Sequence, residues 1–266
     1  MINYSNNYLS LSVFVIFVFA LSGCIENTGN LNKTGEIGKE NFSKEISTDS
    51  LLDMCVKRAY DIRHYEFEEM VKISISGTMN MQISINQNGI VNLKEKRFFV
   101  ASDFNIMNTV LQAEMYKIDA QIYYAEVKDN KREWKIYTKE DVENKLGFIK
   151  YADLFNPDDD YGKKFTSLKN TEKEIVGSEL IDGQNCGIVK IYVNTIEVLK
   201  EKNLSANEGN SIENLELKLW ISKSNGDVMK EYKLMTLKGN NNAITTIEKT
   251  TLYKNYNKEV VINPPI

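Results

Sequence analysis

Few residues of this chain could carry out catalysis. The 266 residues include one histidine and three cysteines. His64 would have to serve any histidine-based site, yet it follows the apolar stripe of a predicted helix, where a position at the surface or the helix end explains it. The sequence contains neither a G-x-S-x-G nucleophile loop nor a glycine-rich phosphate loop. We therefore expect no catalytic residues and no cofactor.

Metal and nucleic-acid binding are also disfavoured. Asp158, Asp159 and Asp160 could gather oxygen ligands for Ca²⁺, but they lack the twelve-residue EF-hand pattern and its closing glutamate. A solvated loop or a helix cap fits them better, so we expect no metal site. The chain has 33 Lys and Arg against 37 Asp and Glu, a net charge of -4. Nucleic-acid-binding domains are usually basic.

The chemistry that the sequence does indicate lies at Cys24. An uncharged apolar run, Leu9 to Leu21, ends in Leu21-Ser22-Gly23-Cys24. The run is shorter than the roughly 20 residues of a membrane-spanning helix, but it suits the core of a signal peptide. The motif resembles the lipobox of prokaryotic lipoproteins. This resemblance implies cleavage between Gly23 and Cys24 and a diacylglyceryl thioether on Cys24, whose thiol is the strong nucleophile of the segment.

The lipobox defines the expected organisation of the chain. Residues 1–23 form the signal peptide, residues 24–48 a lipidated flexible tether rich in Asn, Gly, Thr, Lys and Glu, and residues 49–266 one folded domain. Two acyl chains would anchor the protein stably in the cell membrane, facing the extracytoplasmic side. The alternative is that Cys24 is an ordinary buried thiol after an N-terminal anchor helix.

The folded domain is predicted to begin with a helix and continue as strands. Asp49 or Ser50 can cap a helix that ends near residues 63–65. Period-2 alternation from Val71 to Ile85 then predicts one long strand, or two bent at Gly77, with one apolar face. The run 86–89, Asn-Gln-Asn-Gly, is typical of a hairpin turn, after which residues 90–101 return.

The rest of the chain repeats this pattern. Strands are expected in 115–137, with a turn at 129–130, and short helices at 142–146, 161–168 and 196–202. Further strands are expected at 174–180, 186–193, 212–222, 228–237 and 244–253, with Asp182-Gly183 and Asn225-Gly226 as turns. The predicted fold class is α+β, mainly β. It consists of a long antiparallel meander with a leading helix and a short helical insertion.

Several segments resemble the LolA/LolB and mycobacterial LppX/LprG-type lipoprotein carriers. They are YEFEEMVKISISG at 65–77, Ile122-Tyr123-Tyr124, Glu133-Trp134-Lys135, LIDGQNC at 180–186, Leu219-Trp220-Ile221-Ser222, NGDVMK at 225–230 and VVINPP at 260–265. The resemblance implies an antiparallel half-barrel wrapped around helices, with an apolar cavity between them. It also implies carriage or sensing of a lipid at a membrane surface, without catalysis.

The residues expected at the cavity or its rim are apolar or aromatic. They are Met79, Met81, Ile83, Tyr123, Trp134 and Trp220. Methionine adapts to varied apolar surfaces, and Tyr and Trp suit a rim that is apolar on one side and wet on the other. The alternative is that these side chains simply fill the core. The protein would then be a lipid-anchored structural or protein-interaction module of the cell envelope, without a ligand.

Two thiols, Cys55 and Cys186, remain after lipidation of Cys24. Disulfides persist in extracytoplasmic compartments, and a Cys55–Cys186 bridge would clamp the leading helix onto the sheet. The alternative is two buried thiols. No C-x-x-C motif is present, which argues against a thioredoxin-like redox role.

Overall fold

The computed structural model describes residues 46–77, 80–106, 109–119, 121–138, 161–193, 211–239 and 243–266. The helical elements are α2 (Thr48–Asp61), α5 (Tyr161–Thr166) and the 3₁₀ turn η2 (Ser167–Asn170). The strands are β1 (His64–Ser76), β2 (Met81–Asn92), β3 (Arg97–Ile106), β4 (Thr109–Ile118), β5 (Gln121–Lys128), β6 (Lys131–Arg132), β7 (Lys135–Tyr137), β8 (Glu172–Ile181), β9 (Gln184–Tyr192), β10 (Ser211–Ser222), β11 (Val228–Lys238) and β12 (Ile244–Lys254).

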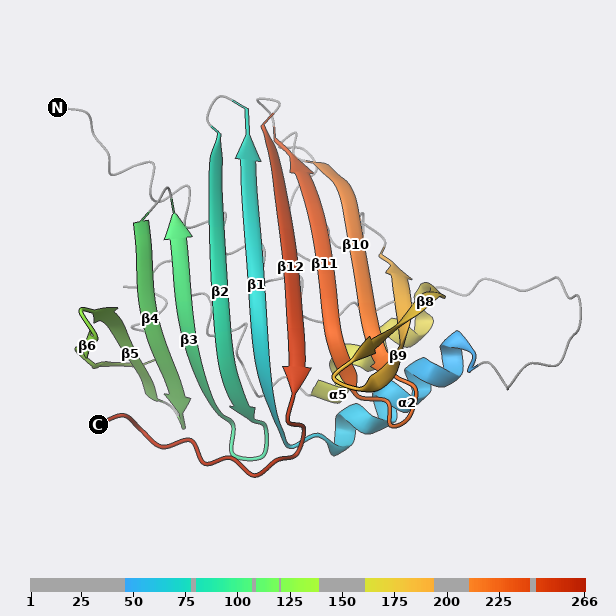
Figure 1. The fold of residues 1–266 in the computed structure, drawn as a ribbon, viewed down its shortest axis with the longest axis horizontal. Coiled ribbons are helices and arrows are strands. Elements are labelled where there is room, and N and C mark those ends of the chain that lie inside the picture. Colours follow the sequence, from blue (N-terminus) through green and yellow to red (C-terminus); the bar gives the residue numbers. More distant parts are fainter. Residues whose placement is uncertain are drawn as a thin grey trace, which may run out of the picture.

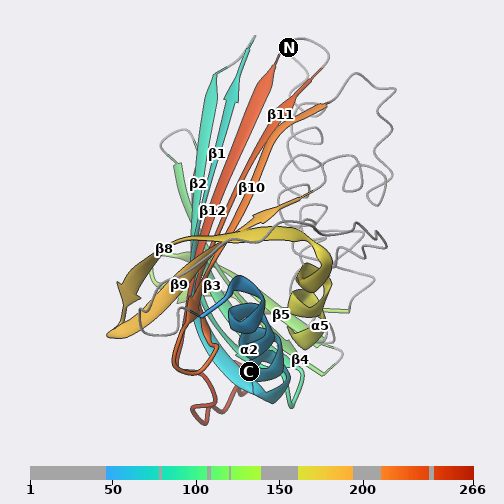
Figure 2. The ribbon, with the colours of Figure 1, turned by 90° about the vertical axis from the view of Figure 1, so that its right-hand side faces the viewer.

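The strands form one twelve-stranded antiparallel sheet that remains open. Its order is β6-β5-β4-β3-β2-β1-β12-β11-β10-β9-β8 (Figure 1). The short strand β7 pairs with β5. Two meanders are thus joined through the antiparallel pair of β1 and β12. The sheet curves around α2 and α5, which lie on the same side of it (Figure 2). We call this side the inner face and the opposite side the outer face. The predicted fold class, a mainly β half-barrel with a leading helix, is confirmed.

Helix α2 begins two to three residues earlier than the sequence pattern predicted. Its N-cap is Ser47, whose Oγ accepts a hydrogen bond from the backbone N of Ser50 at 3.2 Å. The helix ends at Asp61, and His64 is already the first residue of β1. Ser47 and Thr48 are therefore part of the helix and its cap.

The β10–β11 turn holds α2 against the sheet. The Arg58 Nε atom donates to Oδ1 of Asp227 at 2.7 Å, and Asp227 is buried. Gly226 has a positive φ of 79°, and a Cβ there would lie 2.6 Å from the carbonyl oxygen of Met54. Only glycine combines this backbone conformation with so close an approach to the helix. The turn predicted at Asn225-Gly226 is confirmed, and it also orients α2.

The hairpin turn predicted at Asn86-Gln87-Asn88-Gly89 is wrong. These residues lie inside β2, paired with β1 on one side and β3 on the other. The turn comes later, at 93–96, where Asn92 Oδ1 accepts from the backbone N of Glu95 and Lys96 has a positive φ. Glycine is needed at residue 89 for a different reason: a Cβ would lie 2.5 Å from the Phe67 ring and 2.6 Å from the carbonyl oxygen of Phe99.

Most other predicted elements are confirmed within a few residues. The alternating stretch 71–85 is two strands, β1 and β2, which reverse around Gly77. The turns at 129–130 and 182–183 are confirmed, as are the strands that flank them and the helical segment at 161–168. The helices predicted at 142–146 and 196–202 and the loop at 158–160 lie outside the described residues. Among the described residues, no helix is long and apolar enough to cross a membrane.

Candidate ligand-binding face

The inner face of the sheet is apolar over a greater length than α2 can cover. Because side chains alternate along a strand, Phe67, Val71 and Ile73 of β1 share this face, and all three are buried in the main core with α2. The helix has 14 residues, which span about 21 Å. Strand β1 has 13 residues, which span about 43 Å. Figure 2 shows α2 and α5 gathered toward one end of the strands.

A row of polar side chains interrupts this apolar face. Register places Ser102, Gln87, Glu69, Thr251 and Glu231 opposite one another on five adjacent strands, β3, β2, β1, β12 and β11. All five residues are buried. A contiguous buried polar row on an otherwise apolar face is unusual, since each such group must be compensated inside the protein.

Two lysines complete the row and neutralise its carboxylates. Lys249 Nζ lies 2.6 Å from Oε2 of Glu69, and Lys233 Nζ lies 2.6 Å from Oε1 of Glu231. The lysine side chains are only 13% and 14% exposed. Together with the five residues of the row they form what we call the polar belt. Its two carboxylates and two ammonium groups balance in charge, which buried charges require.

Hydroxyl groups supply further hydrogen bonds to the carboxylates. Thr251 Oγ1 donates to Oε2 of Glu69 at 2.9 Å, and the Tyr253 hydroxyl donates to Oε2 of Glu231 at 3.4 Å. Burial and the nearby carboxylates of Glu231 and Glu69 raise the pKa of the Tyr65 hydroxyl. Tyr65 therefore stays neutral at physiological pH. The charges of the belt are thus held in a fixed polar network.

Gln87 is the exception within the polar belt. Its Nε2 atom donates to Oγ of Ser102 at 2.7 Å. Its Oε1 atom is buried and has no hydrogen-bond partner among the described residues. A buried amide oxygen without a hydrogen bond lowers the free energy of unfolding by about 1–3 kcal/mol. Gln87 therefore offers an unused acceptor on this face.

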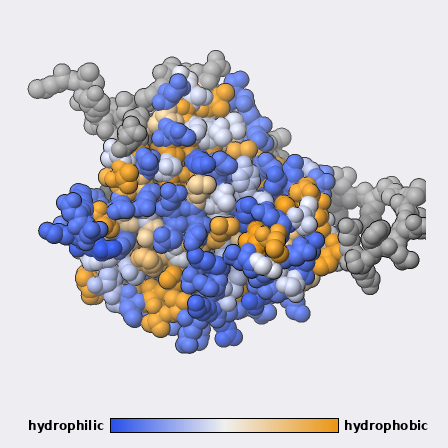
Figure 3. Space-filling model, in the orientation of Figure 1, coloured by the Kyte–Doolittle hydropathy of each residue, from blue (hydrophilic) through white to orange (hydrophobic). Residues whose placement is uncertain are grey.

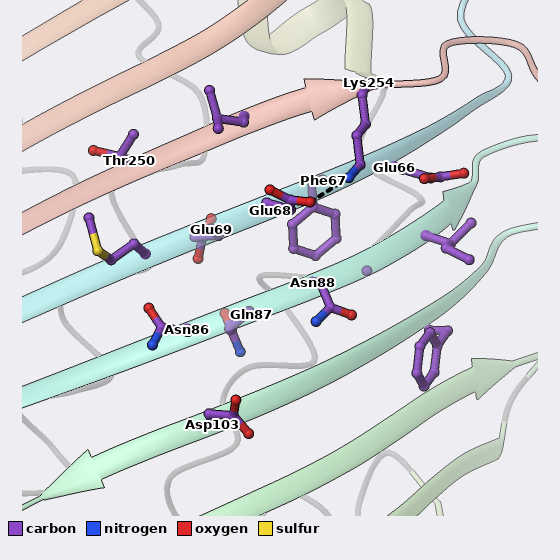
Figure 4. Close-up of a pocket in the computed structure, with 15 residues that line it drawn as sticks. Glu66, Phe67, Glu68, Glu69, Asn86, Gln87, Asn88, Asp103, Thr250 and Lys254 are labelled. Atoms are coloured by element: carbon purple, nitrogen blue, oxygen red, sulfur yellow. Dashed lines mark hydrogen bonds and ion pairs between the residues drawn. The ribbon is translucent and has the colours of Figure 1, made fainter.

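The outer face of the sheet carries a groove. Figure 3 shows hydrophilic side chains across much of this face. A groove of about 580 Å³ lies over β1, β2, β3 and β12, lined by residues that include Glu66, Glu68, Asn88 and Lys254. In Figure 4 these side chains stand over the strands, whereas Gln87 and Glu69 lie behind the ribbons.

The charged groups of this groove are already paired with one another or with neighbouring side chains. Glu68 forms an ion pair with Lys254, and Asn255 Nδ2 donates to Oε2 of Glu66 at 2.8 Å. Asp103 accepts from Gln112 Nε2 at 2.9 Å. These charged groups of the groove therefore already have partners. Because Gln87 on the inner face keeps an acceptor without one among the described residues, the inner face is the stronger candidate for binding.

The predicted cavity residues divide between the two faces. Met81 and Ile83 are buried in the main core on the inner face, and Met79 lies outside the described residues. Tyr123 and Trp220 lie on the other face of their strands. Tyr123 is directly opposite Tyr116 of β4, and Trp220 is directly opposite Lys230 of β11. They point to the outer face, so the structure does not bring them together with Met81 and Ile83.

The outer aromatic residues pack in two small clusters. Tyr123 is buried with Ile118 and Ile262 of the C-terminal segment, and Trp134 packs on that cluster 5.4 Å from the Tyr116 ring. Trp220 belongs to the other cluster, with its Nε1 donating to Glu179 at 2.5 Å and Lys230 Nζ 4.3 Å above its ring. Tyr123, Trp134 and Trp220, expected at a cavity or its rim, thus lie on the outer face, away from Met81 and Ile83. They hold the C-terminal segment and the β8–β9 hairpin.

Of the two alternatives for Cys55 and Cys186, the structure has the second: no disulfide joins them, and both are buried thiols. Strand geometry explains this. A Cβ at Gly187 would lie 2.6 Å from Cδ2 of Leu51, so position 187 faces α2. Its neighbour Cys186 therefore faces the outer side, where it packs with Trp220 and Met229, while Cys55 lies in the main core. Burial and Glu179 raise the pKa of the Cys186 thiol, which keeps it protonated.

The remaining candidates do not form a catalytic or metal site in the described part of the chain. No group of three His, Cys, Asp or Glu residues is placed to hold a metal ion within those residues. His64 is partly buried at the start of β1, where its carbonyl accepts from the backbone N of Asn257. Gly23 and Cys24 lie outside the described residues.

The chain is similar in structure to several solved proteins. One is the Mycobacterium tuberculosis lipoprotein LppX, with 10% identity, a TM-score of 0.40 and coverage of 82% of this chain and 100% of that one. Another is a putative outer membrane lipoprotein-sorting protein domain from Vibrio parahaemolyticus, with 7% identity, a TM-score of 0.31 and coverage of 79% and 93%. A third is a LolA superfamily protein from Nitrosomonas europaea, with 8% identity, a TM-score of 0.25 and coverage of 82% and 96%.

No family model and no curated protein sequence matches the chain. The likeness to these three structures concerns the fold alone. The function proposed below rests on the residues of this chain.

Proposed function

We propose that the protein is a lipid-anchored envelope protein that binds a lipid or another hydrophobic molecule on its inner face, without catalysis. The observation that carries this proposal is the inner face itself: a long apolar surface crossed by a buried polar belt. An apolar surface with a few placed polar groups is the usual composition of a site for an amphipathic small molecule. The apolar part would accept the chains, and the belt would lie beside the head group.

The sequence supports the location of this activity. The lipobox at Leu21–Cys24 would place two acyl chains at the N-terminus and hold the domain at the membrane surface. The segment before Ser47 would act as a tether of about 20 residues, which spans on the order of 25 Å. A binding face close to the membrane could then exchange a hydrophobic ligand with the bilayer.

The alternative function is a structural or protein-interaction module with a filled core. The outer groove over β1, β2, β3 and β12 favours this reading, because it is open and lies on the free face of the sheet. Its charges are already paired, however, whereas the polar belt keeps an acceptor without a partner among the described residues, Oε1 of Gln87.

Extraction of the purified protein tests the proposal. The full chain is isolated from membranes of its host, extracted with organic solvent, and the extract is analysed by mass spectrometry. We expect a stoichiometric apolar molecule that is not covalently attached. The same purification from cells that lack the protein controls for carried-over membrane lipid. A folded chain that yields no more lipid than this control would contradict ligand binding and favour the interaction module.

A further inference from the structure

The amide of Gln87 has an unused hydrogen-bonding group in a place where water is excluded. Gln87 is only 5% exposed, and its Oε1 lacks a partner among the described residues. Its position is central, since it is directly opposite Ser102 on one side and Glu69 on the other. It therefore combines burial, an unmet hydrogen bond and a location on the apolar inner face.

The chemistry of this amide indicates which group would satisfy it. The Gln87 nitrogen already donates to Ser102, so the atom left for a ligand is the acceptor Oε1. A ligand hydroxyl can donate a hydrogen bond to this oxygen. A methyl ether or an ester in the same place can only accept.

The charge of the polar belt restricts the ligand further. Glu69 and Glu231 are each paired with a lysine at 2.6 Å, so each carboxylate and each ammonium group of the belt already has a partner of opposite charge. A head group with a net charge would enter this buried region without a counterion, and an unpaired buried charge is strongly unfavourable. An uncharged head avoids this cost.

We propose that the polar belt binds the uncharged, hydroxyl-bearing head of an amphipathic lipid through the Gln87 amide, with the lipid chains along the apolar inner face. This inference rests on the proposed function and narrows its ligand to hydroxyl lipids. It predicts discrimination among lipids that share the same chains and differ only in the head.

Photolabelling with matched lipids tests this prediction. The full chain in vesicles is exposed to a diacylglycerol that carries a diazirine in one acyl chain, to its methyl ether, or to the matching phosphatidic acid. At subsaturating probe we expect the hydroxyl lipid to label the protein about tenfold more than the ether, the effect of about one buried hydrogen bond. In Gln87→Leu this ratio should fall to near one.

A matched control lies on the same strand. Gln82 is exposed, so Gln82→Leu makes the same chemical change at a position away from the belt and should keep the tenfold ratio. The urea unfolding midpoint of Gln87→Leu, compared with that of Gln82→Leu, shows whether the Leu variant at position 87 is folded. Equal labelling by ether and alcohol, or stronger labelling by phosphatidic acid, would overturn the inference while leaving lipid binding intact. Failure of every probe to label would remove the proposed function as well.

Discussion

Replacement of Cys24 by serine is expected to abolish lipid modification and leave residues 1–23 attached. The thioether requires the thiolate, which serine cannot supply, and cleavage before Cys24 would follow lipidation. Intact-mass spectrometry of the membrane fraction measures both changes in one spectrum. The wild-type chain should begin at Cys24 and carry the diacylglyceryl mass. The Cys24→Ser chain should contain the full 266 residues and no added mass.

Ser22→Ala is the matched control for this experiment. It keeps a small residue before the cleavage site, so processing should continue as in the wild-type chain. A wild-type chain that retains residues 1–23, or that begins after Gly23 without added lipid mass, would contradict the lipoprotein assignment.

Replacement of Glu69 by leucine is expected to lower the free energy of unfolding by about 3–5 kcal/mol, because it leaves the Lys249 ammonium buried without its carboxylate. Lys249 is 13% exposed in its side chain, so water can solvate it only in part. The double variant Glu69→Leu/Lys249→Leu removes both charges and should recover most of the loss. Urea unfolding of the full chain in mild detergent, followed by circular dichroism, measures all three proteins.

The outer face supplies the control for this pair. Lys254 and Glu68 form an ion pair of the same type between neighbouring strands, but their side chains are 40% and 53% exposed. Surface pairs contribute about 0–1 kcal/mol, so Lys254→Leu should change the stability little. If Glu69→Leu cost no more than Lys254→Leu, the polar belt would be solvated rather than buried, and its role as a head-group site would lose its physical basis.

The strands and turns that sequence reasoning placed correctly are those with strong local signals. Asp182-Gly183 and Asn225-Gly226 are turns because glycine has a positive φ at both places, a conformation that side chains disfavour. The apolar alternation of Val71, Ile73 and Ile75 correctly predicted one buried face. These signals depend on neighbouring residues alone, so one sequence is enough to read them.

The candidate site could not be predicted in the same way, because residues 86–89, which include Gln87, have the composition of a hairpin turn. Asn86 to Gly89 are typical of a hairpin, yet Gln87 belongs to the polar belt and Gly89 makes room for the Phe67 ring. One signal was available: continuing the alternation back from Val71 places Glu69 on the buried side of β1. Its partner Lys249 is 180 positions further along the chain, and only the pairing of β1 with β12 brings the two together.

The local sequence pattern also could not predict on which face of the sheet each aromatic side chain lies. Trp220 is flanked by Leu219 and Ile221, and Tyr123 is flanked by Ile122 and Tyr124. Apolar residues therefore occupy both the odd and the even positions of these strands. The alternation rule then gives no preference for either face. The structure resolves this because small clusters on the outer face, with Ile262 and with Met229, bury Tyr123 and Trp220 there.

Fluorescence quenching by a brominated lipid tests most directly whether a ligand occupies the inner face. Phe104 lies on that face, opposite Ile85, and is only partly buried. A full chain with Phe104→Trp, Trp134→Phe and Trp220→Phe reports on the inner face, and the wild-type chain, with Trp134 and Trp220, reports on the outer face. Each protein is loaded with brominated diacylglycerol and returned to unbrominated vesicles. We expect strong quenching of Trp at position 104 and little quenching in the wild-type chain. The reverse pattern would place the ligand on the outer face and contradict the central claim.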